Sequence, residues 1–454
     1  MQTGDIKEVK IEKLIYEGVG LAHIDNLAIF VENACDGDIV KIEITSLNKT
    51  FARAKIVEFV SKSKYRTEKP FCALANVCGG CQWSFIKYEH QLELKQQIIK
   101  EALRKILPEN IEVLPTIPCK NIKNFRHKIQ LPVSQTKNSK RFLIGYYKPR
   151  THEIVNIKHC EIQPPQIDEL TEDIREKARD LEIEAYNETT HKGLLRHIVF
   201  KISKFNNEIL LTFVINSQKP NTKIEDLAKF LKEKHKNIAG ICVNFNTQKN
   251  NIILSKDTKN ILGQDFYREK LQDKIYQISA NSFFQTNPYI AEQILNVIKK
   301  DIGKNFKQPS ILDAYSGVST FGIYLSDIAS NIVCVESETS SCKDAMASLS
   351  LNNIQNIEII NDDATKVFDN FIKNHKKFDI AIIDPPRKGS TKEALSDISK
   401  MTAKTIYYVS CNPQTLARDG EILKQHGFEL SFVQGADMFA HSYHIETIAK
   451  FDRQ

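Results

Sequence analysis

Residues 406–413 read Ile-Tyr-Tyr-Val-Ser-Cys-Asn-Pro, an apolar run that ends in a polar tetrapeptide with a thiol. Residues 380–387 repeat the pattern as Ile-Ala-Ile-Ile-Asp-Pro-Pro-Arg. Such apolar runs are typical of strands buried in a parallel sheet. Ligands bind at the carboxyl ends of these strands, which is where Asp384 and Cys411 lie. We therefore predict an α/β sheet with a reactive cleft at its edge. The alternative is that Cys411 is an ordinary buried core thiol.

The same rhythm of apolar runs continues on both sides of this pair. Strands are predicted at residues 311–313, 331–335, 357–360, 378–383, 405–409, 428–433 and 443–451. The gaps between the earlier runs have the length of a helix, which is the pattern of a parallel βαβ sheet. Residues 271–454 are therefore predicted to form a Rossmann-like α/β domain.

The chain before this domain has two different patterns. Residues 1–60 show short alternating strands separated by glycines, which indicates a small OB-like β-barrel. Such a barrel either binds oligonucleotides or only supports its neighbours. Residues 61–270 mix β and α signals, with a strand at 209–215, and are predicted to form a central α+β domain. Within it, residues 85–106 have the pattern of an amphipathic helix, which we expect to pack on the C-terminal domain.

Composition limits the class of protein. The 454 residues are 41% hydrophobic and carry a net charge of +7, which suits a globular protein of two or three domains. The sequence has no signal-peptide pattern and no run of about 20 apolar residues that would indicate a membrane helix. We expect a cytoplasmic monomer that does not contact a membrane. Its ten cysteines are then metal ligands, nucleophiles or core residues rather than disulfides.

Four of these cysteines have a spacing that indicates a metal centre. Cys72, Cys78 and Cys81 lie close together, with two glycines before the third, and Cys160 lies far downstream. Zinc sites usually pair two short C-x-x-C knuckles, and this chain has one. Four thiolates at unequal spacing are more typical of an iron–sulfur cluster. Zinc remains the alternative, and the membership of Cys160 stays open.

The segment between the third and fourth of these cysteines is strongly basic. From residue 120 to residue 160 ten Lys or Arg residues accompany one acid, Glu153, with aromatic residues between them. Cations neutralise phosphates and aromatic faces stack on unpaired bases, so the mixture indicates contact with single-stranded or looped RNA. The candidate RNA-binding residues are Phe125, Arg126, Lys128 and Arg141. A solvated lysine-rich surface is the alternative interpretation.

The first strand of the C-terminal domain leads into a cofactor loop at residues 311–321. A dinucleotide loop needs G-x-G-x-x-G, whereas this loop has only Gly317 and opens with an acid, Asp313. Glu336 ends the next strand, where a carboxylate can accept the hydroxyls of a ribose. Asp363 follows the third strand. The loop therefore favours S-adenosylmethionine over a dinucleotide.

Together these motifs resemble the RNA uracil-5-methyltransferases, specifically the iron–sulfur branch that acts on 23S rRNA. The resemblance covers nearly the whole chain and rests on the four cysteines and on residues 283–287, 313–321, 384–387, 410–413 and 444–447. It implies an N-terminal TRAM domain, a small iron–sulfur RNA-binding domain and an S-adenosylmethionine methyltransferase domain. The implied metal centre is a 4Fe–4S cluster, and the implied partner is 23S rRNA. The transfer-RNA branch lacks the cysteine cluster.

The resemblance also implies roles for individual residues. The cofactor and base pocket is lined by Gln285, Asp313, Tyr315, Gly317, Thr320, Glu336, Asp363 and Asp384. We expect Cys411 to add to carbon 6 of a flipped uracil, Asp384 to position the ring and Glu446 to remove the proton from carbon 5. One departure is Ser319, where the family usually has a second glycine.

Two other functions fit part of the sequence. Asp-Pro-Pro at residues 384–386 resembles the motif with which amino-methyltransferases hold an exocyclic amine, but those enzymes need an aromatic residue where Arg387 stands. They also have no use for Cys411. A non-catalytic RNA-binding assembly factor is the second alternative. The complete cofactor loop, Cys411 and Glu446 argue against it.

Overall fold

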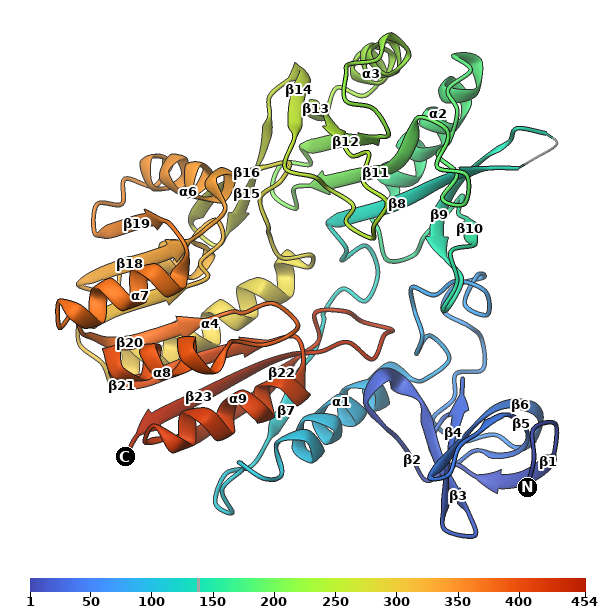
Figure 1. Cartoon of the computed structure of the whole chain (residues 1–454), viewed down its shortest axis with the longest axis horizontal. Coiled ribbons are helices and arrows are strands. Elements are labelled where there is room, and N and C mark those ends of the chain that lie inside the picture. Colours follow the sequence, from blue (N-terminus) through green and yellow to red (C-terminus); the bar gives the residue numbers. More distant parts are fainter. Residues whose placement is uncertain (137–138) are drawn as a thin grey trace.

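The computed structural model describes residues 1–136 and 139–454, which form three regions built on sheets. In Figure 1 the N-terminal barrel is blue, the central region is mostly green and the C-terminal sheet is orange to red. Within the described residues, no helix combines the length and the apolar character needed to cross a bilayer.

The N-terminal region is a six-stranded sheet with the order β1-β5-β6-β4-β3-β2. Every second residue of β5 is buried, at Val40, Ile42 and Ile44, because one face of the strand lines the barrel core. A short 3-10 turn, η1 (Tyr16–Gly18), joins β2 to β3. The strands are β1 (Ile6–Lys10), β2 (Lys13–Leu14), β3 (Gly20–Ile24), β4 (Leu27–Glu32), β5 (Ile39–Leu47) and β6 (Phe51–Ser61).

The helix predicted at 85–106 is α1 (Tyr88–Leu103), which packs against the C-terminal region. Its Ile99 lies against Gly435 of that region, where a larger residue would collide with the isoleucine. The next strand, β7 (Leu114–Ile117), pairs in parallel with β22 (Phe428–Ala436) and forms an edge of the C-terminal sheet. A segment of the predicted central region therefore completes the C-terminal sheet, which the sequence did not predict.

The central region is a seven-stranded sheet with the order β10-β9-β8-β11-β12-β13-β14. The strand predicted at 209–215 is β12, whose seven residues are all buried, as expected for a central strand covered on both faces. The strands are β8 (Lys128–Gln135), β9 (Phe142–Tyr147), β10 (Ile154–Asn156), β11 (Leu195–Ile202), β12 (Ile209–Ile215), β13 (Ile238–Phe245) and β14 (Thr258–Gly263). The helices are α2 (Pro165–Asp180) and α3 (Thr222–Lys234). A hairpin of β15 (Phe266–Leu271) and β16 (Lys274–Ser279) follows.

The C-terminal sheet has the order β19-β18-β17-β20-β21-β23-β22-β7. Its first five strands are parallel, and β23 runs antiparallel between β21 and β22. The predicted doubly wound α/β arrangement is thus present. The remaining strands are β17 (Ser310–Ala314), β18 (Asn331–Glu336), β19 (Ile357–Asn361), β20 (Phe378–Ile383), β21 (Thr402–Ser410) and β23 (Glu446–Arg453).

Helices cover both faces of this sheet (Figure 1). Alternate residues of β17 enter different cores, Ile311 on the side of α4 and α5 and Leu312 on the side of α7, α8 and α9. The helices are α4 (Pro288–Asn305), α5 (Thr320–Leu325), α6 (Thr339–Leu351), α7 (Ala364–Lys373), α8 (Lys392–Met401) and α9 (Pro413–Gln425).

The last strand begins later than its apolar run predicts. The prediction was 443–451, but β23 begins at Glu446. The backbone amide of His444 donates to Ser442 Oγ (3.3 Å), so the chain turns before it enters the sheet. Residues 437–445 therefore form a loop, here called the catalytic-edge loop, that delivers Glu446 to the end of the sheet.

Candidate active site and cysteine cavity

Cys411 lies in the turn between β21 and α9. Asn412 caps the helix by accepting a hydrogen bond from the amide of Gln414 (3.0 Å), and Pro413 occupies the first helical position. The Asn412 side chain also donates to the carbonyl of Arg387 (3.4 Å), which joins this turn to the one after β20. The thiol is half-buried at the rim of the sheet, so it is not an ordinary core cysteine.

Asp384 lies at the corresponding rim position of the neighbouring strand, β20. Its Oδ2 accepts a hydrogen bond from Gln285 Nε2 (3.2 Å). Gln285 belongs to the loop before α4, so two segments about a hundred residues apart meet here. The sequence predicted both residues in one pocket, and the structure brings them together.

Glu446 reaches the same rim from the opposite direction. The antiparallel register pairs Ser410 with Thr447, so the next residues outward, Cys411 and Glu446, follow at adjoining ends of β21 and β23. Glu446 is 7% exposed. The strand order β20-β21-β23 therefore places Asp384, Cys411 and Glu446 at one edge of the sheet.

The charged groups of the cleft shift one another's pKa values. Burial and, to a smaller extent, the Glu446 carboxylate raise the pKa of the Cys411 thiol to about 11, while the Arg387 guanidinium opposes them. Burial raises the pKa of Glu446 well above its usual value, and the nearby Asp384 carboxylate adds to this effect. The raised pKa makes the ionised Glu446 carboxylate a stronger base than an exposed glutamate, which favours proton removal once it is ionised.

The cofactor loop turns sharply after β17. Three of its residues, Tyr315, Gly317 and Ser319, have positive φ angles of 62°, 56° and 57°. This conformation costs little for glycine and about 1 kcal/mol for other residues. A glycine is therefore the unstrained choice at position 319, and the serine accepts strain in a fully buried site.

The predicted ribose and cofactor residues surround this loop. Glu336 accepts hydrogen bonds from the amides of Gly317 (2.9 Å) and Glu338 (2.7 Å), which fixes its carboxylate beside the loop. Asp363 is exposed and caps α7 by accepting from the amide of Thr365 (3.0 Å). Tyr315 contacts Ser390 Oγ (3.3 Å), and Thr320 is the first residue of α5. These residues stay predicted cofactor ligands.

Asp313 requires a correction. Its side chain is buried beneath α5, where Oδ2 accepts a hydrogen bond from the Gly322 amide (3.0 Å). Burial raises its pKa to about 7, so this carboxyl is a weaker source of negative charge for the cofactor loop than an exposed aspartate would be. Asp313 holds the start of α5 in place and thereby shapes the loop.

The four predicted metal ligands line one small apolar cavity. Cys72, Cys78, Cys81 and Cys160 share it with Phe71, Leu74 and Tyr146. Cys160 lies 79 positions after Cys81, yet its thiol is close enough to act with burial in raising the pKa of Cys81 to about 12. The spacing alone left the membership of Cys160 open, the family resemblance included it, and the fold brings it to the other three.

The donor chemistry of this cavity suits a thiolate-bound metal centre. Backbone amides donate to two sulfurs, from Leu74 to Cys72 (3.4 Å) and from Gly80 to Cys78 (3.4 Å), and such contacts stabilise thiolates. Burial raises the pKa of Cys78, and the nearby Arg126 guanidinium opposes this rise. Within the described ranges, however, no three His, Cys, Asp or Glu side chains are already gathered as a metal site. The cavity supplies the right ligands, and the centre itself stays a prediction.

The predicted RNA-binding residues have different surroundings. Phe125 is 1% exposed in the core, so the prediction that its ring stacks on a base is wrong. Arg126 lies over the ring of Tyr146 (5.4 Å) and Lys128 over the exposed ring of Phe283 (4.9 Å). Arg141 is exposed. An aromatic residue such as Phe125 signals core as readily as stacking, because burial depends on packing that the local pattern does not contain.

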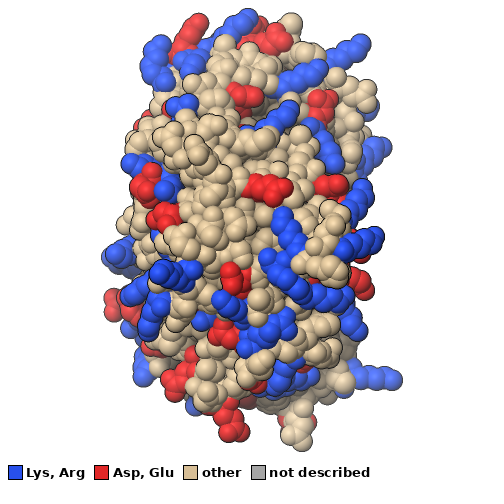
Figure 2. All heavy atoms as spheres, turned by 90° about the vertical axis from the view of Figure 1, so that its left-hand side faces the viewer, with Lys and Arg blue, Asp and Glu red and all other residues tan. Residues whose placement is uncertain are grey.

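Surface charge is mixed on the side of the molecule next to α6 and β19. In Figure 2 basic and acidic side chains alternate over this face, without a continuous basic stripe. A polyanion needs charge of one sign over an extended area. This face is therefore a poor candidate for RNA contact, unlike the side that carries the basic segment.

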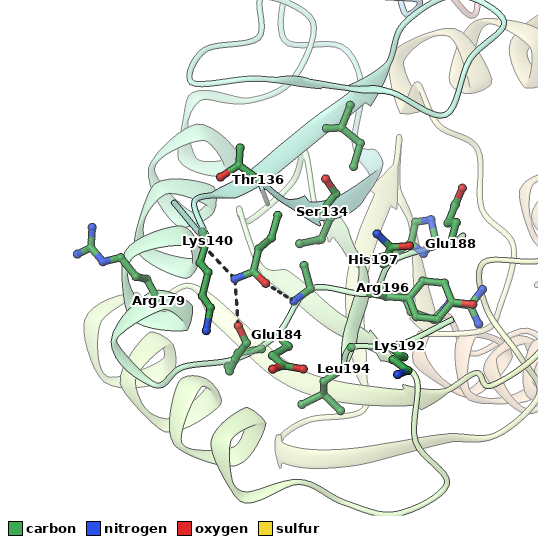
Figure 3. A pocket seen from close by; sticks show the side chains of 18 of the residues that line it. Ser134, Thr136, Lys140, Arg179, Glu184, Glu188, Lys192, Leu194, Arg196 and His197 are labelled. Atoms are coloured by element: carbon green, nitrogen blue, oxygen red, sulfur yellow. Dashed lines mark hydrogen bonds between the residues drawn. The ribbon is translucent and has the colours of Figure 1, made fainter. Parts of the chain in front are cut away.

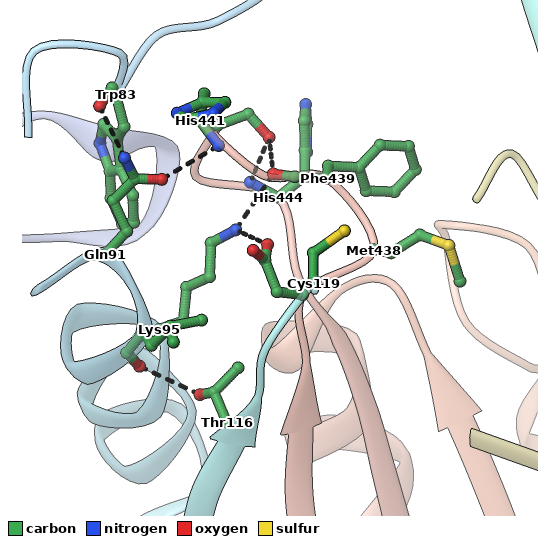
Figure 4. A network of polar contacts seen from close by, with 12 residues as sticks. Trp83, Gln91, Lys95, Thr116, Cys119, Met438, Phe439, His441 and His444 are labelled. Carbon is green, nitrogen blue, oxygen red and sulfur yellow. Dashed lines mark hydrogen bonds and ion pairs between the residues drawn. The ribbon is translucent and has the colours of Figure 1, made fainter. Parts of the chain in front are cut away.

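A buried ion pair, which the sequence did not predict, connects the cysteine cavity to the cleft. Lys95 of α1 donates to Asp437 Oδ1 (2.5 Å) and to the carbonyl of Phe439 (3.1 Å), and both charged side chains are fully buried (Figure 4). His441 of the same loop stacks on Phe71 of the cysteine cavity, with ring centroids 3.7 Å apart. The ion pair thus holds the catalytic-edge loop against α1, and the stacked rings hold it against the cysteine cavity. A lysine among the apolar positions of α1 was the available signal.

Comparisons with known proteins agree with this architecture. Residues 87–453 match the family model described as tRNA (uracil-5-)-methyltransferase, and residues 1–57 match the TRAM domain. A relative from Clostridium acetobutylicum, called an uncharacterized RNA methyltransferase, is 34% identical and covers 98% of this chain and 96% of its own. A second relative with the same description, from Caldanaerobacter subterraneus, is 33% identical, and the match covers 100% of this chain and 99% of the relative.

A solved structure is similar over the whole chain. It is the Pyrococcus abyssi tRNA (uracil-54, C5)-methyltransferase in complex with S-adenosyl-L-homocysteine, with a TM-score of 0.77 and 27% identity. The match covers 98% of this chain and 100% of that one. The barrel, central region and C-terminal sheet therefore occur together, in a similar arrangement, in a second protein.

Proposed function

We propose that this chain, which belongs to the tRNA (uracil-5-)-methyltransferase family, methylates carbon 5 of a specific uridine in 23S rRNA. S-adenosylmethionine supplies an electrophilic methyl group. The observation that carries the proposal is the meeting of Cys411, Glu446 and Asp384 at one edge of the sheet, beside the cofactor loop. An amino-methyltransferase has no use for a thiol and a base in this arrangement.

The chemistry assigns one task to each side chain. The Cys411 thiolate adds to carbon 6 of the flipped uracil, and the resulting enolate carries electron density to carbon 5. Carbon 5 forms a bond to the methyl group as the bond between that methyl and its sulfonium sulfur breaks. Glu446 removes the carbon 5 proton, the double bond re-forms and the bond from carbon 6 to Cys411 breaks. Asp384, oriented by Gln285, binds the ring edge.

We also propose that Cys72, Cys78, Cys81 and Cys160 hold a 4Fe–4S cluster, with zinc as the alternative. Methyl transfer moves no net electrons, so the role is structural. The loop carrying the cysteines is tied to β9 by a hydrogen bond from the Gly79 amide to the carbonyl of Tyr147 (2.9 Å). A cluster would join that loop to the segment around Cys160, which follows β10. Iron, sulfide and zinc analysis of protein purified without oxygen distinguishes the two metals.

A uridine of tRNA is the second candidate target. It is supported by the similarity to the Pyrococcus abyssi enzyme, whose title names uracil-54 of tRNA. The four cysteines favour rRNA as the target, because they resemble those of the iron–sulfur branch that acts on 23S rRNA. The basic segment is consistent with this choice.

The target is tested by mass spectrometry of 5-methyluridine. Ribosomal and transfer RNA would be separated from cells with and without the gene and digested to nucleosides. We expect the loss of one or more 5-methyluridines from 23S rRNA and their return with the wild-type gene but not with Cys411→Ala. Loss from tRNA alone would establish the second candidate.

A further inference from the structure

A cavity of about 970 Å³ lies in the central region, outside the features described so far (Figure 3). Its walls come from the ends of β8 and β9, the end of α2 and residues 182–197. Among the described residues that line it, none belongs to the proposed catalytic, cofactor or cysteine set. Cavities of this size typically bind a ligand of nucleotide size.

As far as the structure describes them, the walls of this cavity combine aromatic rings with five Lys or Arg residues and three acids, Glu182, Glu184 and Glu188. The Arg196 guanidinium lies 4.5 Å from the centre of the Tyr186 ring. Tyr147 lies beside the His152 ring, with centroids 5.2 Å apart, and its hydroxyl donates to Glu188 (3.2 Å). Flat aromatic and guanidinium faces are the surfaces on which unpaired bases stack.

Two buried side chains of the cavity have polar atoms without a partner. His197 and Arg196 are 9% and 5% exposed, and within the described part of the chain His197 Nδ1 and Arg196 Nε form no hydrogen bond. A buried polar atom left unpaired costs about 1–3 kcal/mol, so a bound water, ion or ligand is expected to satisfy it. Burial lowers the pKa of His197 to about 4, so near neutral pH its ring offers one donor and one acceptor. That combination matches the edge of a nucleobase.

The rim carries cations at positions that solvent reaches. Lys140 and Lys192 are exposed and both line the cavity. In Figure 3 they extend from opposite sides of it. Exposed lysines contribute attraction to phosphate without selecting a base.

The cavity shares a wall with the other features that we assign to RNA contact. Successive residues of β9 face opposite sides, so Tyr146 lines the cysteine cavity while Tyr147 lines this one. In the turn that follows, Arg150 forms an ion pair with Glu32 of the barrel. The barrel, this turn and the cavity are therefore neighbours in the structure.

We propose that this cavity binds an unpaired nucleotide of the RNA substrate, at a site separate from the reacting uridine. Its base packs against Tyr147 and is read by His197, while Lys140 and Lys192 hold the flanking phosphates. The inference rests on the proposed action on RNA, but not on which RNA is methylated.

Photo-crosslinking of the full chain tests the proposal with a probe that needs no knowledge of the target. The probe is a single-stranded 12-nucleotide oligouridylate that contains 4-thiouridine. We expect cross-linked peptides from residues 147–152 and 186–197. Tyr147→Ala and Lys192→Ala should each weaken binding of the probe, by about tenfold for the aromatic residue, because one stacked base is lost.

The control is Lys236→Ala, an exposed lysine of the same region that does not line the cavity. It should bind the probe like the wild type. Cross-links confined to the barrel and the catalytic cleft, or normal binding by Tyr147→Ala, would overturn the proposal. So would competition by uridine monophosphate at the affinity of the oligonucleotide, because the cavity would then be a site for free nucleotides. Methylation of the transcript without cross-links at the cavity would leave the proposed function intact.

Discussion

The cleft and the cysteine cavity both contain buried thiols, but the two regions differ in what surrounds them. Burial raises the pKa of Cys411 to about 11 and that of Cys81 and Cys160 to about 12, so burial alone does not separate them. Cys411 has Glu446, Asp384 and Arg387 beside it, whereas the four cysteines have mainly one another and apolar side chains. A reactive thiol is therefore recognised by its acid–base partners, and a structural one by other thiols.

The two regions are not independent. The catalytic-edge loop ends in Glu446 of the cleft and stacks His441 on Phe71 of the cysteine cavity. The ion pair between Lys95 and Asp437 holds the start of this loop. Loss of either support should therefore affect the cleft, and the predictions below separate chemistry from support.

The largest effect is expected from Cys411→Ala. Without the nucleophile carbon 5 stays unactivated, so methylation should fall by about 10⁴-fold or more. RNA carrying 5-fluorouridine should form no covalent complex, while RNA affinity stays unchanged. Cys342→Ala, which removes a buried thiol outside both regions, is the control and should methylate normally. Adduct formation by Cys411→Ala would place the nucleophile elsewhere.

Replacement of the general base Glu446 should separate thiol addition from removal of the carbon 5 proton. In Glu446→Gln the thiol still adds, but the carbon 5 proton stays, so turnover should fall by about 10²–10⁴-fold. The covalent protein–RNA complex should accumulate as a shifted band on a denaturing gel. Glu421→Gln, an exposed acid on α9, should turn over normally. Normal turnover of Glu446→Gln would remove Glu446 from this role.

Lys95→Met tests whether the ion pair between Lys95 and Asp437 supports the catalytic-edge loop. It leaves Asp437 buried without its cation, which should lower the free energy of unfolding by about 3–5 kcal/mol. Denaturant unfolding measures this loss, and Lys100→Met, exposed on the same helix, should change it little. Equal stability of the two variants would show that the ion pair does not hold the loop.

The raised pKa of Cys411 predicts a steep pH dependence. Below a pKa of about 11 the thiolate fraction grows about tenfold per pH unit. The rate of adduct formation with 5-fluorouridine RNA should therefore rise by about a hundredfold between pH 7 and pH 9. Rapid-quench gels measure the rate. A plateau below pH 8 would mean that the thiol is already ionised in the complex.

The smallest effect is expected in the cysteine cavity. Cys81→Ser should lose the iron absorbance and weaken RNA binding by about tenfold, because the wall formed by β9 loses its support. The chemical step of RNA already bound should change little. Cys242→Ala, a core thiol of the same region, should keep both properties. Full RNA affinity in a colourless Cys81→Ser protein would exclude a supporting role.

Local sequence patterns were sufficient to predict much of the C-terminal domain. The apolar runs at 378–383 and 405–409 became β20 and β21, and the polar residues after them came to the predicted edge. The prediction succeeds because backbone geometry sets both the alternation of side chains along a strand and the usual length of a strand. Phe125 shows the limit, since an aromatic residue among lysines turned out to be core.

The sequence by itself determined a doubly wound sheet whose strand ends carry Asp384 and Cys411, and a barrel before it. Tertiary structure alone decided that Cys160 meets Cys81, that β7 joins the C-terminal sheet and that Lys95 pairs with Asp437. The reason is physical. A local pattern states which face of an element is apolar, but distant side chains meet only when the packing of whole elements excludes water from both.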